Sequence, residues 1–293
     1  MRKILYSYYQ CYSTDREEKE TMNPDDLMQM AEFGKQVYDT LTDDQKQNLL
    51  GPPTKSLGRG LASLFDIAFY KPNSWAMKFN HKLEEQAKLL EKETSPMIEQ
   101  LIENDEYSED TLPLAVKALE SSKYQLNSEI LRNYYSKLIT SSLTKDVNTK
   151  VSPNFSTILS NFSEKDAVFL KRMVTEKDFI NGIGFSDIRV ADSNGYGYEP
   201  FTYLIVWENN EIENCSEQIA SLLSFGLIRE WNMFTSQVET ERYAKVEKSP
   251  YFVGLKNAID SGNFGNYTTI SVLKKSILLT ELGRSFVSSA VPI

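Results

Sequence analysis

Apolar residues between positions 24 and 162 recur at intervals of three and four, which places them on one side of successive helices. A helix is predicted from Ser74 to Glu93, and a separate short helix from Ser95-Pro96 to Ile102, because proline favours a first helical turn. Further helices are expected over residues 54–70, 110–119, 127–139 and 152–162. No strand is predicted up to residue 162.

The pattern changes after residue 162. Ser163 and Asp166 resemble a capping box and predict a helix start, with Asp in place of the usual Glu or Gln. The β-branched and aromatic run Phe201–Trp207 predicts a strand. The other expected elements are a helix that starts at Ser216 and stops at Gly226, paired strands over 227–231 and 270–279, a helical insertion after Ser249-Pro250, and a last helix over 281–289.

This order of elements is that of a winged helix. We therefore predict a mainly α protein with three parts: a tyrosine-rich arm at 1–23, a helical domain at 24–162, and an elaborated winged-helix (α+β) domain at 163–293. The last domain carries an insertion at 244–266.

Composition points to a reducing, aqueous compartment. The chain has a net charge of −9 and two cysteines, too few for a disulfide framework. No run reaches the roughly 20 apolar residues of a membrane-spanning helix, and the N-terminus lacks the apolar run of a secretory signal. A cytoplasmic protein is expected, with peripheral association at the inner membrane as an alternative.

Residues suited to catalysis are sparse. His81 is the single histidine, no glycine-rich phosphate loop is present, and Cys215 has no histidine or second cysteine near it in sequence. We therefore expect no catalytic residues, no metal site and no cofactor, and interpret Cys215 as structural. A cryptic carboxylate-dependent nuclease or hydrolase is the alternative, because sequence alone does not show which carboxylates meet in space.

The basic stretch from residue 51 to 82, with five cations and one anion, is the sharpest candidate for contact. Its helix over 54–70 has an apolar face beside cations, a pattern typical of helices that lie in a membrane interface or against an acidic partner. The alternative is that this face simply packs in the protein core. The predicted contact residues are Leu57, Leu61, Leu64, Phe65, Ile67, Lys55, Arg59, Lys71, Trp75 and Lys78.

Winged helices often bind DNA, so a DNA-binding regulator is a further alternative. Residues 163–293 carry a net charge of −4, and the helix over 216–224 that would enter the major groove has no cation. Phosphate contacts need Lys or Arg, so nucleic acid is an unfavoured partner.

Several segments resemble the abortive infection alpha (Abi-alpha) family of bacterial phage-defence proteins. The resemblance covers about residues 37–180, with weaker similarity at 222–228 and 279–286. The segments that carry it are Leu57-Gly58-Arg59-Gly60-Leu61, Leu112–Leu119, Leu131–Ser142, Ser152–Leu159 and Phe162–Ala167.

The resemblance implies a role in sacrificing or arresting the infected cell, and it brings no catalytic residues to carry over. We therefore expect a non-enzymatic defence protein whose partner is a phage-encoded trigger or a host component. Association between copies of the chain stays open. The arm at 1–23 and the insertion at 244–266 lie outside the family pattern and are candidates for partner choice.

Overall fold

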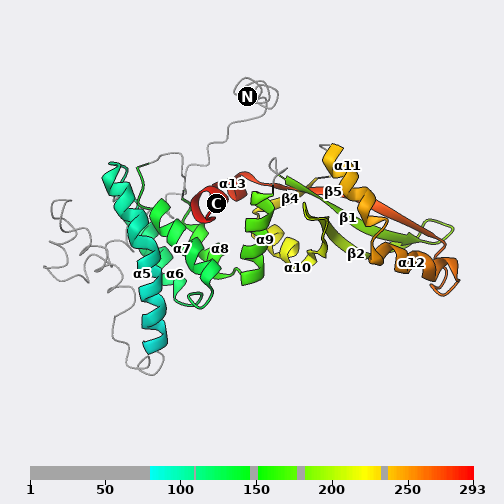
Figure 1. Cartoon of the computed structure of the whole chain (residues 1–293), viewed down its shortest axis with the longest axis horizontal. Helices are drawn as coiled ribbons and strands as arrows, with labels where there is room; N and C mark the ends of the chain where they lie inside the picture. Colours follow the sequence, from blue (N-terminus) through cyan, green and yellow to red (C-terminus); the bar gives the residue numbers. More distant parts are fainter. Residues whose placement is uncertain (1–79, 109, 146–150, 177–181, 232–236) are drawn as a thin grey trace, which may run out of the picture. The chain divides into compact units, whose positions relative to one another are not determined.

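A computed structural model describes residues 80–108, 110–145, 151–176, 182–231 and 237–293 (Figure 1). Within these residues the chain forms nine helices and five strands. The elements are α5 (Asn80–Glu103), α6 (Leu112–Ser122), α7 (Glu129–Ser141), α8 (Asn154–Ser160), α9 (Glu164–Thr175), β1 (Gly182–Ala191), β2 (Gly197–Val206), β3 (Ile212–Asn214), α10 (Ser216–Ser224), β4 (Ile228–Trp231), α11 (Gln237–Val246), α12 (Pro250–Asp260), β5 (Thr269–Leu279) and α13 (Glu281–Ala290).

Helix α7 is the centre of the helical part. It packs against α5, α6, α8, α9 and α13, so the last helix of the chain joins the core formed by the earlier ones (Figure 1). Tyr134 and Tyr135 are residues of α7, and their rings are completely buried. Phe286 of α13 contacts two phenylalanines of the helical part, with ring centroids 5.3 Å from Phe155 and 5.5 Å from Phe162. Burial of large aromatic side chains is a major source of stability in such a core.

The predicted break at Ser95-Pro96 is wrong, because α5 runs through it as one helix with Pro96 inside. Proline in a helix interior removes one hydrogen bond and costs about 3 kcal/mol. Ala87, Leu90, Thr94 and Ile98 are buried at helical spacing on both sides of the proline, and α5 packs on α7. We infer that burial of this continuous stripe outweighs the lost hydrogen bond.

Before residue 163 the described part of the chain contains only an isolated bridge, between Tyr107 and Thr144, and no strand. The five strands that follow form one antiparallel sheet in the order β3-β2-β1-β5-β4. Strand β5 pairs with β1 over ten residues and with β4 over four. The predicted pairing of residues 227–231 with 270–279 is therefore confirmed, although β1 is the longer partner of β5.

Helices α11 and α12 lie on one face of the sheet (Figure 1). The core beneath them is a cluster formed by Ile188, Leu204, Val206 and Val246, against which side chains of α12 pack. Helix α12 begins as predicted after Ser249, whose hydroxyl accepts a hydrogen bond from the Phe252 N–H. Helix α11 was not predicted.

Local signals at helix ends were informative. Ser163 and Asp166 form a complete capping box at the start of α9, as predicted. Gly226 follows α10 with φ +69°, the left-handed conformation that commonly ends helices. The winged-helix domain itself stays a prediction, while the mixture of helices with an antiparallel sheet is established.

Candidate functional site

The predicted contact segment lies outside the described residues. This applies to Leu57, Leu61, Leu64, Phe65, Ile67, Lys55, Arg59, Lys71, Trp75 and Lys78. The insertion at 244–266 is described, and it contributes α12 and the loop before β5.

The pairing of β1 with β2 has two register shifts, and the first of them is a β-bulge in β2 that contains a left-handed residue. Ser186 pairs with Leu204 and Ile188 pairs with Phe201, so two residues of β2 stand opposite Asp187. One of them, Tyr203, has φ +54°, a conformation that is uncommon for residues other than glycine. The Asp187 carboxylate holds this conformation, since its Oδ1 accepts a hydrogen bond of 2.8 Å from the Tyr203 N–H. Bulges and positive φ values of this kind are enriched near functional sites.

The Tyr203 side chain extends across the sheet. Its ring centroid lies 4.9 Å from that of Phe185 on β1, and its hydroxyl donates a 2.5 Å hydrogen bond to Glu230 on β4. Burial and the Glu230 carboxylate both raise the pKa of Tyr203 above its usual range. Tyr203 is therefore a protonated hydrogen-bond donor at neutral pH and is poorly suited to act as a base.

Two ion pairs lie on this face of the sheet. Lys275 Nζ lies 2.7 Å from Asp187 Oδ2, and the hydrogen bond that it donates to Asp187 raises the pKa of Lys275. Farther along the strands, Arg189 pairs with Glu199 at 2.6 Å. We name Asp187, Tyr203, Glu230 and Lys275 the sheet network. Its members hold one another in place rather than presenting an unpaired reactive group.

A second polar cluster surrounds Trp207, where β2 ends. The Arg172 guanidinium lies 4.1 Å from the centre of the Trp207 ring and pairs with Glu211 at 2.9 Å and Glu213 at 3.2 Å. Trp207 Nε1 also donates to Glu213, at 2.9 Å. The hydrogen bond from Arg172 lowers the pKa of Glu211.

A hollow of about 470 Å³ adjoins this cluster and is lined by Arg172, Glu176, Trp207, Glu208 and Asn209. Glu176 is itself engaged, because it accepts from the Glu208 N–H at 2.7 Å and from buried Arg242 at 2.9 Å. The Glu176 carboxylate and the Arg172 guanidinium, which both line the hollow, are thus committed to contacts between α9, α11 and the β2–β3 turn.

Cys215 is completely buried before α10, and its Sγ lies 3.8 Å from the Glu213 carbonyl oxygen. Burial raises the pKa of the Cys215 thiol to about 12. The thiol is therefore protonated at neutral pH, whereas a reactive cysteine acts as a thiolate. This agrees with its interpretation as a structural residue.

Two further observations concern the described residues alone. No three His, Cys, Asp or Glu side chains among them converge in the manner of metal ligands. None of their helices combines the length and apolar character that crossing a membrane requires.

Sequence reasoning did not single out the sheet network. Asp187 and Lys275 lie in strands whose other residues are largely apolar. A charged residue within such a strand indicates that an oppositely charged partner lies nearby, because buried charges are normally paired. Their partnership depends on the register of β1 against β5, which only the structure provides. The bulge that turns Tyr203 left no signal in the sequence.

Comparisons with known proteins complete the description. The family model described as abortive infection alpha matches residues 78–290. No curated protein and no solved structure matches the chain. The matched region contains α5 to α13, and therefore both the helical part and the whole sheet. Since the match covers well over half of the sequence, this chain belongs to the abortive infection alpha family.

Proposed function

We propose that this chain is a non-enzymatic abortive-infection protein that acts by binding a phage or host protein. Membership of the family carries the defence role. Action by contact rather than catalysis is supported by the pairing of charges in both polar clusters, where Arg172, Asp187, Glu213 and Lys275 each have an oppositely charged partner. Charged side chains that are paired in this way stabilise the fold and are less available to activate a substrate.

The test is phage challenge of cells that express the chain, with plating efficiency as the measurement. Protection by the wild type is expected to persist in the double variant Glu211→Gln/Glu213→Gln, which removes the two carboxylate charges paired with Arg172 next to the hollow and keeps the shape of both side chains. Loss of protection in a variant that still folds would instead favour the alternative of a carboxylate-dependent nuclease or hydrolase.

Membrane contact through the 54–70 segment is a second part of the proposal, supported by its apolar and basic sequence pattern. Leu61→Asp or Phe65→Asp should abolish protection and should reduce the membrane-bound fraction measured before and after infection. Tyr124→Asp is the matched control, because it adds the same charge at a side chain that is 86% exposed. Full protection by both segment variants would remove the membrane idea.

We further propose that the winged-helix part contacts protein rather than DNA. Among the exposed positions of α10 are Glu217, Ala220 and Ser224, and none of its residues is a cation. Lys165 of α9 stands 3.8 Å from Glu217, which offsets its charge. DNA binding requires cations at phosphates, so salt-dependent retention of the purified chain on duplex DNA would support the regulator alternative.

A further inference from the structure

Two loops stand next to each other where β1 and β5 end their pairing. The first, residues 192–198, comprises the turn after β1 and the first two residues of β2, and the second, residues 261–267, lies between α12 and β5. The N–H of Thr268 and the hydroxyl of Thr269 both donate to the Ala191 carbonyl oxygen, at 2.9 and 3.1 Å. The rings of Tyr198 and Tyr267 make an edge-to-face contact with centroids 5.4 Å apart. We name these two segments the paired loops.

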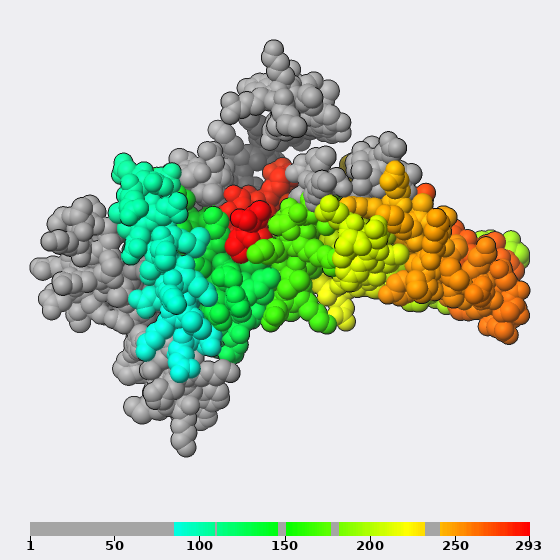
Figure 2. Space-filling model, in the orientation of Figure 1, coloured from blue at the N-terminus to red at the C-terminus, as the bar shows by residue number. Residues whose placement is uncertain are grey.

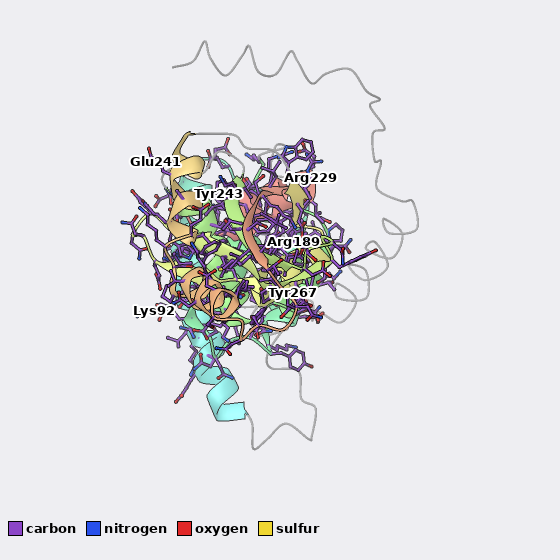
Figure 3. All side chains as sticks on the ribbon, turned by 90° about the vertical axis from the view of Figure 1, so that its right-hand side faces the viewer. Lys92, Arg189, Arg229, Glu241, Tyr243 and Tyr267 are labelled. Atoms are coloured by element: carbon purple, nitrogen blue, oxygen red, sulfur yellow. The ribbon has the colours of Figure 1, made fainter. Side chains whose placement is uncertain are left out.

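The paired loops lie at the surface. Figure 2 shows them at the same end of the sheet, the first in light green and the second in orange, and Figure 3 looks onto this end and labels Tyr267. Residues 193–198 are all exposed, as are most residues of 261–267. Tyr196 is 77% exposed and Tyr198 is 44% exposed. Two exposed tyrosines are therefore two residues apart, Tyr196 in the turn and Tyr198 at the start of β2.

The composition of the paired loops is specific. Twelve of their fourteen residues are Tyr, Ser, Gly or Asn, and the other two are Asp192 and Phe264. Antibody binding loops favour the same four residue types, because tyrosine offers a large amphipathic contact at low entropic cost and the small polar residues adapt their hydrogen bonds. Turn formation accounts for glycine at positions such as Gly195, whose φ is +84°. It does not account for the exposed tyrosines.

The first loop is held in one conformation without a partner. Asp192 Oδ1 accepts hydrogen bonds of 2.9 Å from the N–H groups of Asn194 and Tyr196, and the Gly195 N–H donates to the Asp192 carbonyl oxygen at 3.1 Å. Beside the loop, Arg189 is paired with Glu199. A loop ordered in advance loses less conformational entropy on binding, which favours affinity.

Charge restricts the class of partner. The paired loops contain no cation, and their single carboxylate accepts hydrogen bonds from its own loop. Nucleic acids and anionic membranes both require Lys or Arg for electrostatic attraction, so neither fits. An electrically neutral surface of tyrosine rings, amides and hydroxyls suits a folded protein surface of mixed polar and apolar character.

We propose that the paired loops are the surface that recognises a folded protein partner, with Tyr196 and Tyr198 as the principal contacts. The proposal deepens the partner-binding function given above and rests on it. The test is to place the photo-crosslinking residue p-benzoylphenylalanine at position 196 in cells, with and without phage, and at position 124 as a control. Tyr124 is comparably exposed but lies in the turn after α6.

A discrete crosslinked protein is expected from position 196 and not from position 124. The protein identified by mass spectrometry is then purified and titrated against the wild type, Tyr196→Ser/Tyr198→Ser and Tyr124→Ser. The loop variant should bind at least tenfold more weakly, since truncated tyrosine contacts often lose that much affinity, and the control should bind as the wild type does. Equal melting temperatures will show that the loop variant is folded.

Two outcomes would overturn the paired-loop surface: no crosslink at 196 above that at 124, or equal affinities for the loop variant and the control. The defence role is judged separately by protection in the wild type. Protection that survives in the loop variant would retain the defence role and remove this surface. A crosslinked partner without any protection would retain the surface and remove the role.

Discussion

Replacement of Asp187 by Asn and by Ala separates the two tasks that the structure assigns to this carboxylate. Asp187 is 4% exposed, pairs with Lys275 at 2.7 Å, and accepts the N–H of left-handed Tyr203 at 2.8 Å. The Asn variant removes the charge but keeps an oxygen that can accept the Tyr203 N–H. The Ala variant removes both interactions.

The expected magnitudes follow from burial. Breaking a fully buried ion pair by removal of one partner costs about 3–5 kcal/mol, because the other charge is left uncompensated. Lys275 retains 30% exposure and can turn toward water, so Asp187→Asn should cost less, about 2–3 kcal/mol. Asp187→Ala should cost about 1–2 kcal/mol more, because the Tyr203 N–H then loses its acceptor.

The assay is reversible urea unfolding of the full chain, with a double-mutant cycle that combines Asp187→Asn with Lys275→Met. A coupling free energy of about 1.5–3 kcal/mol is expected for groups in direct contact. Equal stabilities of the Asn and Ala variants would refute the role of Asp187 at the bulge. Coupling below about 0.5 kcal/mol would refute the importance of the ion pair, given the usual error of additivity.

The pH dependence provides a further check on the pair. The pKa of Lys275 in the folded protein is raised above its unfolded value by the hydrogen bond that Lys275 donates to Asp187. Its stabilising contribution is therefore complete below the unfolded lysine pKa of about 10.4, and is lost as the pH rises through the folded pKa. The stability gap between wild type and Lys275→Met should be constant around neutral pH and should narrow in this alkaline range.

Three further predictions concern other parts of the fold. Ser163→Ala should destabilise the chain by about 1 kcal/mol in urea unfolding, since the capping hydroxyl of α9 is lost, and no change would contradict the capping box. Gly283→Ala should lower the melting temperature strongly, because an added Cβ would lie 1.9 Å from the Leu227 carbonyl oxygen, and an unchanged melting temperature would contradict that packing. In a Cys11→Ser background, Cys215 should not react with a thiol reagent at neutral pH until urea unfolds the protein, because burial raises the pKa of its thiol to about 12. Fast reaction of the native protein would contradict this prediction.

Elements with a complete local signal could be predicted from the sequence. The start of α9 depends on Ser163 and Asp166, and the end of α10 depends on Gly226, so neighbouring residues decide both. After residue 162 the change in apolar spacing predicted β2, β4 and β5, whereas β1, β3 and α11 were not predicted. By contrast, Pro96 was read as a helix start because its local preference is strong, whereas packing of α5 against α7 decided the outcome.

The sheet network could not be predicted for a different reason. Asp187 and Lys275 are 88 positions apart, and their contact exists only in the register that pairs Phe185 with Lys275. A shift of one residue would move every side chain of β1 to the opposite face. Long-range register is set by the whole core of the sheet rather than by any short segment, so the sequence showed strands but not which charges meet.

Strand β5 is long enough to pair with β4 at one end and to reach the paired loops at the other. Strand β5 pairs with β4 only over Ser276–Leu279, which is the strand pair expected from the winged-helix order. Its first seven residues, 269–275, continue beyond β4 and pair with β1 alone, a length of about 24 Å at the usual rise per strand residue. A short turn from β4 would reach only the near end of β5, whereas α11, α12 and the loop before β5 span the distance. The insertion at 244–266 therefore has a structural role, apart from the partner choice proposed for it, because it leads the chain to the β1–β2 turn, where the rings of Tyr198 and Tyr267 are in contact.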